Sequence, residues 1–328
     1  MRVWRNAAAV VALTVGIAAP RAVHAQRAEG AFQKTLTVSG PADVDVVTGS
    51  GSIEIRQGAA GRVDVSARIR ANDGWGWRRT QLSPEERVRR IEANPPVQQE
   101  GTKVRIGYIT QEELRDSVSV SYVVTVPPGA TLRTNSGSGS QDVDVDGSID
   151  AHSGSGSLKI RRAGAVRAST GSGSVTAETI TTAFQATTGS GSIQVARVGG
   201  AITARTGSGS IEITQTGSGD VNVSSNSGSV RVHGVRGGVS ASTSSGGLHI
   251  DGEMAAEWRL SASSGHVTVD LPKSQRFDLD ANSSSGHIDV DFPMTLPGRS
   301  DRRSIRGAVG GGGPLLHVRT SSGGISIQ

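Results

Sequence analysis

The chain has 328 residues, no cysteine, 45 glycines, 3% aromatic residues and a formal net charge of +5. The lack of cysteine excludes disulfides, cysteine metal centres and thiol catalysis. Because Arg2, Arg5 and Arg21 lie in the N-terminal segment described next, the rest of the chain carries about +2, too weak a charge to predict a nucleic-acid partner.

Residues 1–25 are predicted to be a signal peptide. Arg2 and Arg5 precede an apolar run from Ala7 to Ala19, and Val23-His24-Ala25 offers small residues where a signal peptidase reads the chain, which predicts cleavage before Gln26. The apolar run is shorter than the roughly 20 residues needed to span a bilayer. We therefore expect an exported protein, in the periplasm, on the outer cell surface or secreted, with no transmembrane segment after signal cleavage.

Residues 26–55 are predicted to hold the first copy of a repeat that dominates the chain. Val44/Val46 and Ile53/Ile55 are apolar pairs with one residue between their members, and a Gly-Ser turn joins the two pairs. Alternation with a period of two is typical of half-buried strands. This copy therefore predicts two short strands.

Residues 56–126 depart from the repeat and are predicted to be an insertion that packs on or caps the N-terminal end of the repeat array. Ser83-Pro84-Glu85-Glu86 is a helix start, with Ser as N-cap, Pro at the first position and acids in the first turn. The helix should be short, ending before Pro95-Pro96. Strands are expected at Val63–Ile69, Lys103–Ile109 and Ser117–Val126.

Trp75 and Trp77 flank a glycine in the least regular part of this insertion, beside Arg78 and Arg79. An exposed Trp/Arg cluster could stack on a sugar or on a protein partner. Large apolar residues are usually inside, so a hydrophobic plug for the end of the array is the favoured interpretation.

Residues 127–328 are predicted to form the repeat array. Copies that begin at Ser153, Thr170, Thr188 and Thr206 start 17, 18 and 18 residues apart, and each reads Thr/Ser-Gly-Ser-Gly-Ser-apolar-x-apolar. Self-similarity at such a period is typical of a solenoid, in which each unit buries its apolar face by stacking on the next. We expect an all-β solenoid with two short strands per coil of about 18 residues, whose glycines adopt positive φ where the chain reverses.

Parallel, in-register coils are favoured over an antiparallel meander because like positions recur every 17 to 19 residues. This arrangement predicts that Ile193 pairs with Ile211. It also predicts an inner column of small side chains where the two sheets approach most closely, formed by Ala168, Ala186, Ala204 and Ala241.

The outward row of the strands after each turn shows no catalytic cluster. From Asp144 to Asp289 charged residues alternate with neutral ones, whereas a β-helix enzyme that cleaves acidic polysaccharide would gather acids and bases on neighbouring coils. No nucleophile elbow, phosphate loop or zinc-binding helix motif occurs. We therefore expect neither catalytic residues nor a cofactor.

His266 and His287 take the same place after a turn glycine in copies expected to be adjacent, so they should lie about one strand spacing, ~4.8 Å, apart. With Asp289 or Asp270 they are weak candidates for a divalent-metal site. Exposed turn histidines usually bind nothing, so no metal is predicted.

Arg302 and Arg303 belong to a basic loop, Arg299–Arg306, that could meet an anionic lipid or polysaccharide, although such runs are usually solvated linkers. The last strand ends one residue before Gln328. We therefore expect the last coil, Leu316–Ile327, to be an exposed sheet edge that docks another protein or a second copy of the chain by strand addition.

Val126-Pro-Pro-Gly-Ala-Thr-Leu132, the serial Thr/Ser-Gly-Ser-Gly-x-Ile-x-Ile units and the closing Gly-rich segment Gly310–Ile327 together resemble a bacterial β-strand-repeat domain of unknown function described as a "putative adhesin". The resemblance covers nearly all of the chain after the signal peptide. It implies a β-solenoid, an exported or envelope location and no known catalytic residue.

Two hypotheses of different classes follow. The favoured one is a non-enzymatic exported cell-envelope or secreted protein that acts as an adhesin-like interaction scaffold for a protein or a cell-surface glycan. The rival is a glycan-active parallel β-helix enzyme, a lyase or a hydrolase. An acid cluster on the outer face would favour the rival.

Overall fold

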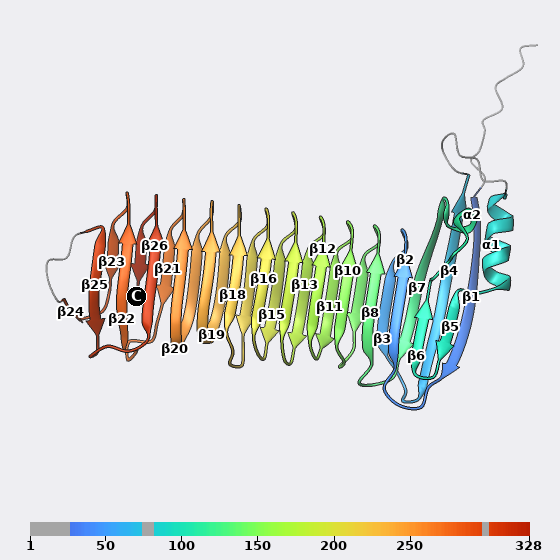
Figure 1. The fold of residues 1–328 in the computed structure, drawn as a ribbon, viewed down its shortest axis with the longest axis horizontal. Coiled ribbons are helices and arrows are strands. Elements are labelled where there is room, and N and C mark those ends of the chain that lie inside the picture. The colour runs from blue at the N-terminus through green and yellow to red at the C-terminus, as the bar shows by residue number, and fades with distance from the viewer. Residues whose placement is uncertain (1–26, 74–81, 297–301) are drawn as a thin grey trace, which may run out of the picture.

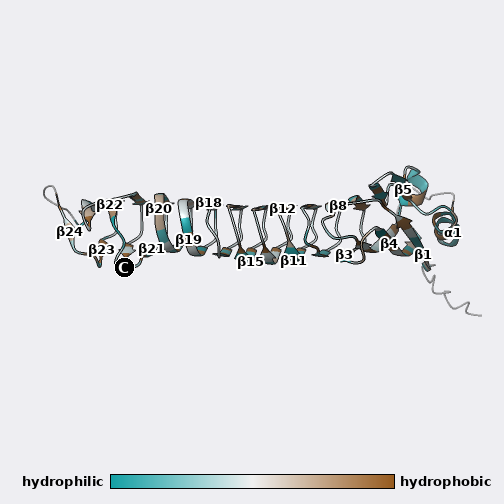
Figure 2. Ribbon diagram, turned by 90° about the horizontal axis from the view of Figure 1, so that it is seen from below, coloured by the Kyte–Doolittle hydropathy of each residue, from teal (hydrophilic) through white to brown (hydrophobic). Residues whose placement is uncertain are grey.

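The computed structural model describes residues 27–73, 82–296 and 302–328. The described chain forms a long rod of stacked coils (Figure 1), and the strands lie in two layers on opposite sides of the rod (Figure 2). The fold is therefore all-β and solenoid-like, as predicted. The proposed signal peptide lies outside the described residues.

Each coil contributes one strand to each layer, on either side of its Gly-Ser turn. The strands that end at the turn form the pre-turn sheet: β2 (Asp43–Thr48), β8 (Thr131–Ser136), β10 (Ile149–Ser153), β12 (Val166–Thr170), β14 (Phe184–Thr188), β16 (Ile202–Thr206), β18 (Val221–Ser225), β22 (Phe277–Ser283) and β26 (Leu315–Thr320). The strands that follow the turn form the post-turn sheet: β3 (Ile53–Gln57), β9 (Gln141–Asp144), β11 (Leu158–Ala163), β13 (Val175–Ile180), β15 (Ile193–Val198), β17 (Ile211–Gln215), β21 (Val267–Asp270), β23 (Ile288–Val290) and β27 (Ile325–Ile327). The longer β19 (Val230–Thr243) and β20 (Leu248–Ala262) begin in the post-turn sheet and end in the pre-turn sheet.

Neighbouring coils are parallel and in register. Ile193 pairs with Ile211, and Val195 pairs with Ile213. The parallel-coil prediction is confirmed, and the antiparallel meander is excluded for the array. Because like residues stack on like, apolar side chains of both sheets meet between the layers and are almost completely buried.

The predicted column of small residues runs through the pre-turn sheet. Ala168 pairs with Ala186, and Ala186 pairs with Ala204. Val223 comes next, followed by Ala241. All five are at most 3% exposed, so the column is confirmed with one larger member.

The repeated turn is held by a buried hydroxyl at its first position. Thr188 Oγ1 accepts a hydrogen bond from the N–H of Gly191 at 3.1 Å and donates to the carbonyl oxygen of Gly173 at 2.9 Å, one coil earlier. Thr170 and Thr206 repeat both bonds. The hydroxyl thus satisfies groups in two coils at once, which explains why Thr or Ser takes this place in the other coils, with Ala262 as an exception.

The turn glycines are required by close packing rather than by positive φ. Gly191 is not among the positive-φ glycines, which corrects the expectation from sequence. A Cβ on Gly191 would lie 2.0 Å from the carbonyl oxygen of Gly173. Successive turns therefore stack too tightly for any side chain at this place.

The first repeat copy stacks directly on the array despite its distance in sequence. Val44 in β2 pairs with Leu132, and Ile53 in β3 pairs with Gln141. On the other side of this coil lie β6 (Lys103–Ile106) and β7 (Val118–Val126), followed by the antiparallel strands β4 (Arg62–Asn72), β1 (Arg27–Thr37) and β5 (Val97–Glu100).

The predicted helix is α1 (Pro84–Ala93), at the N-terminal end of the rod (Figure 1). The side chain of Ser83 caps it by accepting a hydrogen bond from the N–H of Glu86 at 3.2 Å. Glu92 also accepts from the N–H of Ala31 in β1 at 2.8 Å. A second helix, α2 (Glu112–Arg115), is a single short turn.

The last coil lies inside the stack, which corrects the prediction of an exposed edge. β26 pairs with β20 on one side and with β22 on the other, and β27 lies between β21 and β23. Leu316 and Val318 are 0% exposed there, because the coil buries both of its faces along the rod. The rod continues past this coil with β22, β25 (Ser304–Val309) and β24 (Met294–Thr295), which pair antiparallel to one another.

The pairing of strand β9 does not follow the spacing of its valines. Gln141 and Val143, rather than Val143 and Val145, pair with Leu158 and Ile160. The turn length sets this register, so Gln141 takes an inward place. Its amide is satisfied there by Thr134 Oγ1 and by the carbonyl oxygen of His152.

Candidate functional site

A shallow groove, here called the coil groove, crosses the outer face of five consecutive pre-turn strands, β8 to β16, and has a volume of about 380 Å³. One row of its lining consists of the outward residues Arg133, Asp150, Arg167, Gln185 and Thr203. The other row consists of Thr131, the first residue of β8, and of the residue just before each of the next four strands: Ser148, Ala165, Ala183 and Ala201. Five strands at ~4.8 Å spacing give a track roughly 19 Å long.

The lining follows from the register of the coils. Phe184 points into the core, so its neighbours Ala183 and Gln185 both point outward. Because each coil repeats this pattern in register, the small residues form one row and the longer polar residues form another. A depression along the rod is the result.

Charges of opposite sign alternate in the polar row. Arg133 pairs in register with Asp150, and Asp150 pairs with Arg167. Asp150 is also contacted by His152 Nε2 at 2.9 Å. The row therefore presents donors and acceptors side by side without a large net charge, and Gln185 and Thr203 extend it with neutral polar groups.

The outer face of the post-turn sheet carries a charge cluster that the sequence did not reveal. Asp142 binds Arg161 at 2.8 Å, and Asp144 lies 3.3 Å from Arg162. Glu54 and Arg56 form a further ion pair beside them. The hydrogen bond to Asp142 raises the pKa of Arg161. Each acid here has a basic partner, and the pairs Asp142–Arg161 and Asp144–Arg162 join neighbouring coils.

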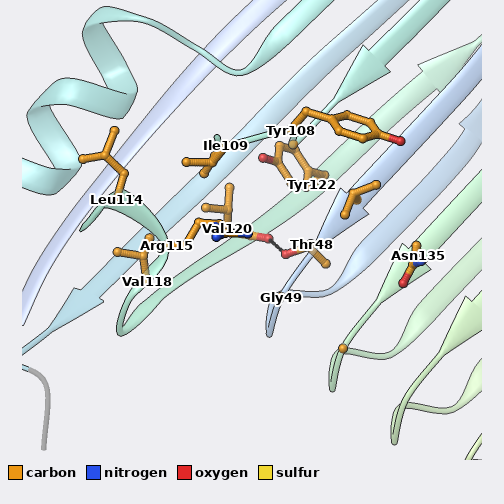
Figure 3. A pocket seen from close by; sticks show the side chains of 13 residues that line it. Thr48, Gly49, Tyr108, Ile109, Leu114, Arg115, Val118, Val120, Tyr122 and Asn135 are labelled. Carbon is orange, nitrogen blue, oxygen red and sulfur yellow. Dashed lines mark hydrogen bonds between the residues drawn. The ribbon is translucent and has the colours of Figure 1, made fainter. Parts of the chain in front are cut away.

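A pocket of about 390 Å³ lies where the first coil meets the N-terminal strands (Figure 3). Its walls are mostly apolar and include Leu114, Val118 and Val120. Tyr122 is 1% exposed, and its hydroxyl has no hydrogen-bond partner among the described residues. Burial raises the pKa of Tyr122. This pocket has room for a small apolar group with one polar atom, but not for an extended chain.

The neighbouring Tyr108 is held differently. Its hydroxyl donates a 2.6 Å hydrogen bond to Asp45 Oδ2, and this bond raises the pKa of Tyr108. Both tyrosines therefore stay neutral at ordinary pH. Tyr108 acts as a hydrogen-bond donor to Asp45.

The histidine pair predicted from sequence is not brought together. β27 lies between β21 and β23, so His266 and His287 are separated by an extra coil, with Gly324 next to the ring of His266. His287 Nε2 lies 3.2 Å from Asp289 Oδ2, and both side chains are exposed. The adjacent-coil expectation is wrong because the sequence does not show that the last coil inserts here.

Arg302 and Arg303 are exposed next to the last strands of the rod. Their backbone carbonyls accept hydrogen bonds from Ile288 and Ser283. The sequence-predicted cluster of Trp75, Trp77, Arg78 and Arg79 lies outside the described residues.

The coil groove was not predicted from the sequence, although the small residues at 148, 165, 183 and 201 recur at the coil period and could have indicated it.

Neither helix in the described parts of the chain is long and apolar enough to cross a membrane. No curated protein of known function matches the sequence. The sequence profile of the Toastrack DUF4097 family matches residues 99–328.

Three solved structures match most of the length of this chain at low identity. One, described as a "putative cell adhesion protein", is from Clostridium sporogenes, with 11% identity, a TM-score of 0.22 and coverage of 91% of this chain and 99% of that one. Another, a "putative adhesin" from Bacteroides fragilis, has 10% identity, a TM-score of 0.33 and coverage of 91% and 97%. A third, a "putative adhesin" from Parabacteroides distasonis, has 8% identity, a TM-score of 0.40 and coverage of 90% and 97%.

Proposed function

The chain belongs to the Toastrack DUF4097 family, and we propose that it is an exported, non-enzymatic, adhesin-like scaffold that binds an extended, uncharged glycan chain in the coil groove. The observation that carries this proposal is the groove itself. It crosses five strands of the rod with the same two side-chain rows in every coil.

The shape of the groove favours a linear ligand. A small molecule would fill only part of a track roughly 19 Å long, whereas a linear chain can repeat the same contacts from coil to coil. Strand addition does not explain binding here, because each of these strands is already paired on both sides.

The chemistry of the groove favours hydroxyl groups. Arg133, Asp150 and Gln185 offer donors and acceptors together, as a sugar with several hydroxyls requires. The methyl groups of Ala183 and Ala201 give the C–H faces of sugar rings an apolar surface. Since the Arg and Asp charges alternate, a strongly anionic or cationic ligand gains little over a neutral one.

Rigidity supports the same function. The outward side chains lie on strands whose backbone is paired on both sides, and the turns are fixed by buried hydroxyls such as Thr188. A preorganised surface loses little conformational entropy on binding.

Export rests on the predicted signal peptide, and cleavage before Gln26 would be seen by N-terminal sequencing of the protein from the producing cell.

The binding proposal is tested on a glycan array with the chain from residue 26 onward. Ala183→Arg fills the groove with a bulky charge and should weaken binding to any glycan hit at least tenfold, which corresponds to about 1.4 kcal/mol. Gln194→Arg is the matched control. Gln194 is exposed in the same coil but on the post-turn sheet, so binding should be unchanged.

Two results would contradict the proposal. One is equal binding by the wild type and Ala183→Arg. The other is cleavage of a bound glycan that stops when a single outward carboxylate is replaced, which would favour the glycan-active enzyme. Binding of proteins but of no glycan would assign the groove to a different class of partner.

A further inference from the structure

Two histidines and an aspartate converge on the outer face of the post-turn sheet, on the opposite sheet from the coil groove and in the two coils that follow its last strand. His233 lies in β19, and His249 and Asp251 lie in the next strand, β20. One ligand atom from each of the three lies within 4.8 Å of the other two. The stacking of coils brings them together, although they are spread over 19 residues of sequence.

The geometry of the three side chains is close. His233 Nδ1 lies 2.5 Å from Asp251 Oδ2, and the two imidazole ring centroids are 5.7 Å apart. Each side chain is about one-third exposed, between 33% and 36%. An ion can therefore reach them from solvent while their strands hold them in place.

A backbone hydrogen bond fixes the orientation of Asp251 in this cluster. The N–H of Gly234 donates to Asp251 Oδ1 at 2.9 Å, which turns the other carboxylate oxygen toward His233. Gly234 adopts a φ of 70°, a conformation that favours glycine. Such contacts behind a ligand are typical of metal sites, because they fix the direction of the ligand atom.

A fourth group stands beside the cluster in the following coil. Asp270 in β21 pairs with Asp251, and its Oδ2 lies 3.4 Å from His249 Nε2. Asp270 Oδ1 is buried and has no hydrogen-bond partner among the described residues. A buried carboxylate oxygen without a partner is costly, so something is expected to satisfy it.

We propose that His233, His249 and Asp251 bind a divalent transition-metal ion such as Zn²⁺, with Asp270 as an additional ligand or as a partner of His249. Two imidazoles and one or two carboxylates form a ligand set that suits Zn²⁺, Co²⁺ or Ni²⁺. Tetrahedral bonds of ~2.0–2.2 Å to one ion require His233 Nδ1 and Asp251 Oδ2 to move apart from their hydrogen-bonded distance, which partly exposed side chains can do by rotating. The ion would join the neighbouring strands β19, β20 and β21 across the outer face of the post-turn sheet.

The test uses Co²⁺, whose visible absorption reports a tetrahedral protein site, followed by calorimetric titration with Zn²⁺. The chain from residue 26 onward should bind one ion. His249→Ala should weaken binding at least tenfold, since even the partners behind metal ligands are worth 10–100-fold in affinity. Asp251→Asn should also reduce the visible absorption of bound Co²⁺.

His287→Ala is the matched control. His287 also lies within ion-pair distance of an aspartate, Asp289, but among the described residues it belongs to no group of three such ligands. Its loss should leave the affinity and the Co²⁺ spectrum unchanged. The proposal is overturned if the wild type binds no Co²⁺ above the level of His233→Ala/His249→Ala, or if His287→Ala and His249→Ala lose affinity equally. Far-ultraviolet circular dichroism of each variant shows whether the fold is retained.

Discussion

The hydroxyl of Thr188 donates a 2.9 Å hydrogen bond to the carbonyl oxygen of Gly173, one coil earlier. Thr188 Oγ1 also accepts a hydrogen bond from the N–H of Gly191, in its own turn, at 3.1 Å. One buried side chain thus closes a turn and fixes the spacing of two coils. The repeated Thr/Ser-Gly-Ser-Gly turn therefore holds neighbouring coils at a fixed spacing along the rod.

Replacing this hydroxyl should destabilise the fold. Thr188→Val keeps the shape but leaves the N–H of Gly191 and the carbonyl of Gly173 without their partner, at a cost of about 1–3 kcal/mol. The midpoint of urea unfolding measures this. Thr187→Val, on the exposed neighbour, should stay within about 0.5 kcal/mol of the wild type. Equal stability of the two variants would show that the turn hydroxyl has no such role.

Close stacking of the turns predicts that Gly191→Ala is destabilising. Its new Cβ would lie 2.0 Å from the carbonyl oxygen of Gly173, so the backbone must move. We expect a loss of about 1–3 kcal/mol, in the range of overpacked cores. The control is Gly49→Ala, because nothing lies within 4 Å of a Cβ at Gly49. A Gly191→Ala protein as stable as Gly49→Ala would contradict the observed turn packing.

The column of small residues predicts that a large side chain will not fit. Ala186 is 0% exposed between Ala168 and Ala204. Ala186→Phe should cost roughly 1–3 kcal/mol or more through overpacking. Gln185→Phe, on the exposed side of the same strand, should have a much smaller effect on the thermal midpoint. An unchanged midpoint for Ala186→Phe would mean that the register is wrong.

The burial of the last coil predicts that truncating two adjacent leucines changes stability by very different amounts. Leu316 is 0% exposed between β20 and β22, whereas Leu315 is 38% exposed. Leu316→Ala should cost about 2–5 kcal/mol by leaving a cavity. Leu315→Ala should change the free energy of unfolding by less than about 0.5 kcal/mol. Comparable small effects would indicate that the last coil is a peripheral edge after all.

Much of this fold follows from local sequence. Alternation of apolar and polar residues predicts the strands, and recurrence at the coil period predicts the parallel stacking. Ser83 with Pro84 predicts the start of the helix. Each of these features depends on neighbours in sequence or on repetition. They could be predicted because the same pattern of residues recurs from copy to copy.

The order of the coils could not be predicted in the same way. Leu316 and Leu279 occupy equivalent places in similar copies, so nothing in their local pattern says which one stacks on Trp258. The structure places Leu316 there. The resulting insertion separates His266 from His287, and so the expected adjacency of these two histidines was wrong together with the predicted edge.

The candidate sites were missed for a related reason. His233 and Asp251 follow the regular strand triplets, at places where a bulge shifts the register between β19 and β20. The spacing of repeats therefore did not align them. The coil groove depends on small residues outside the alternating strand pattern, such as Ala183, and its depth arises only when five coils are stacked.

The proposal that the coil groove binds a linear glycan is tested most directly by methyl NMR of the alanine-labelled protein with a glycan hit from the array. Ala183 and Ala201 line the groove, and Ala196 is exposed on the opposite sheet. We predict that saturating glycan shifts the methyl signals of Ala183 and Ala201 and leaves that of Ala196 in place. Binding that shifts Ala196 alone, or that leaves both groove methyl signals unmoved, would contradict the proposal.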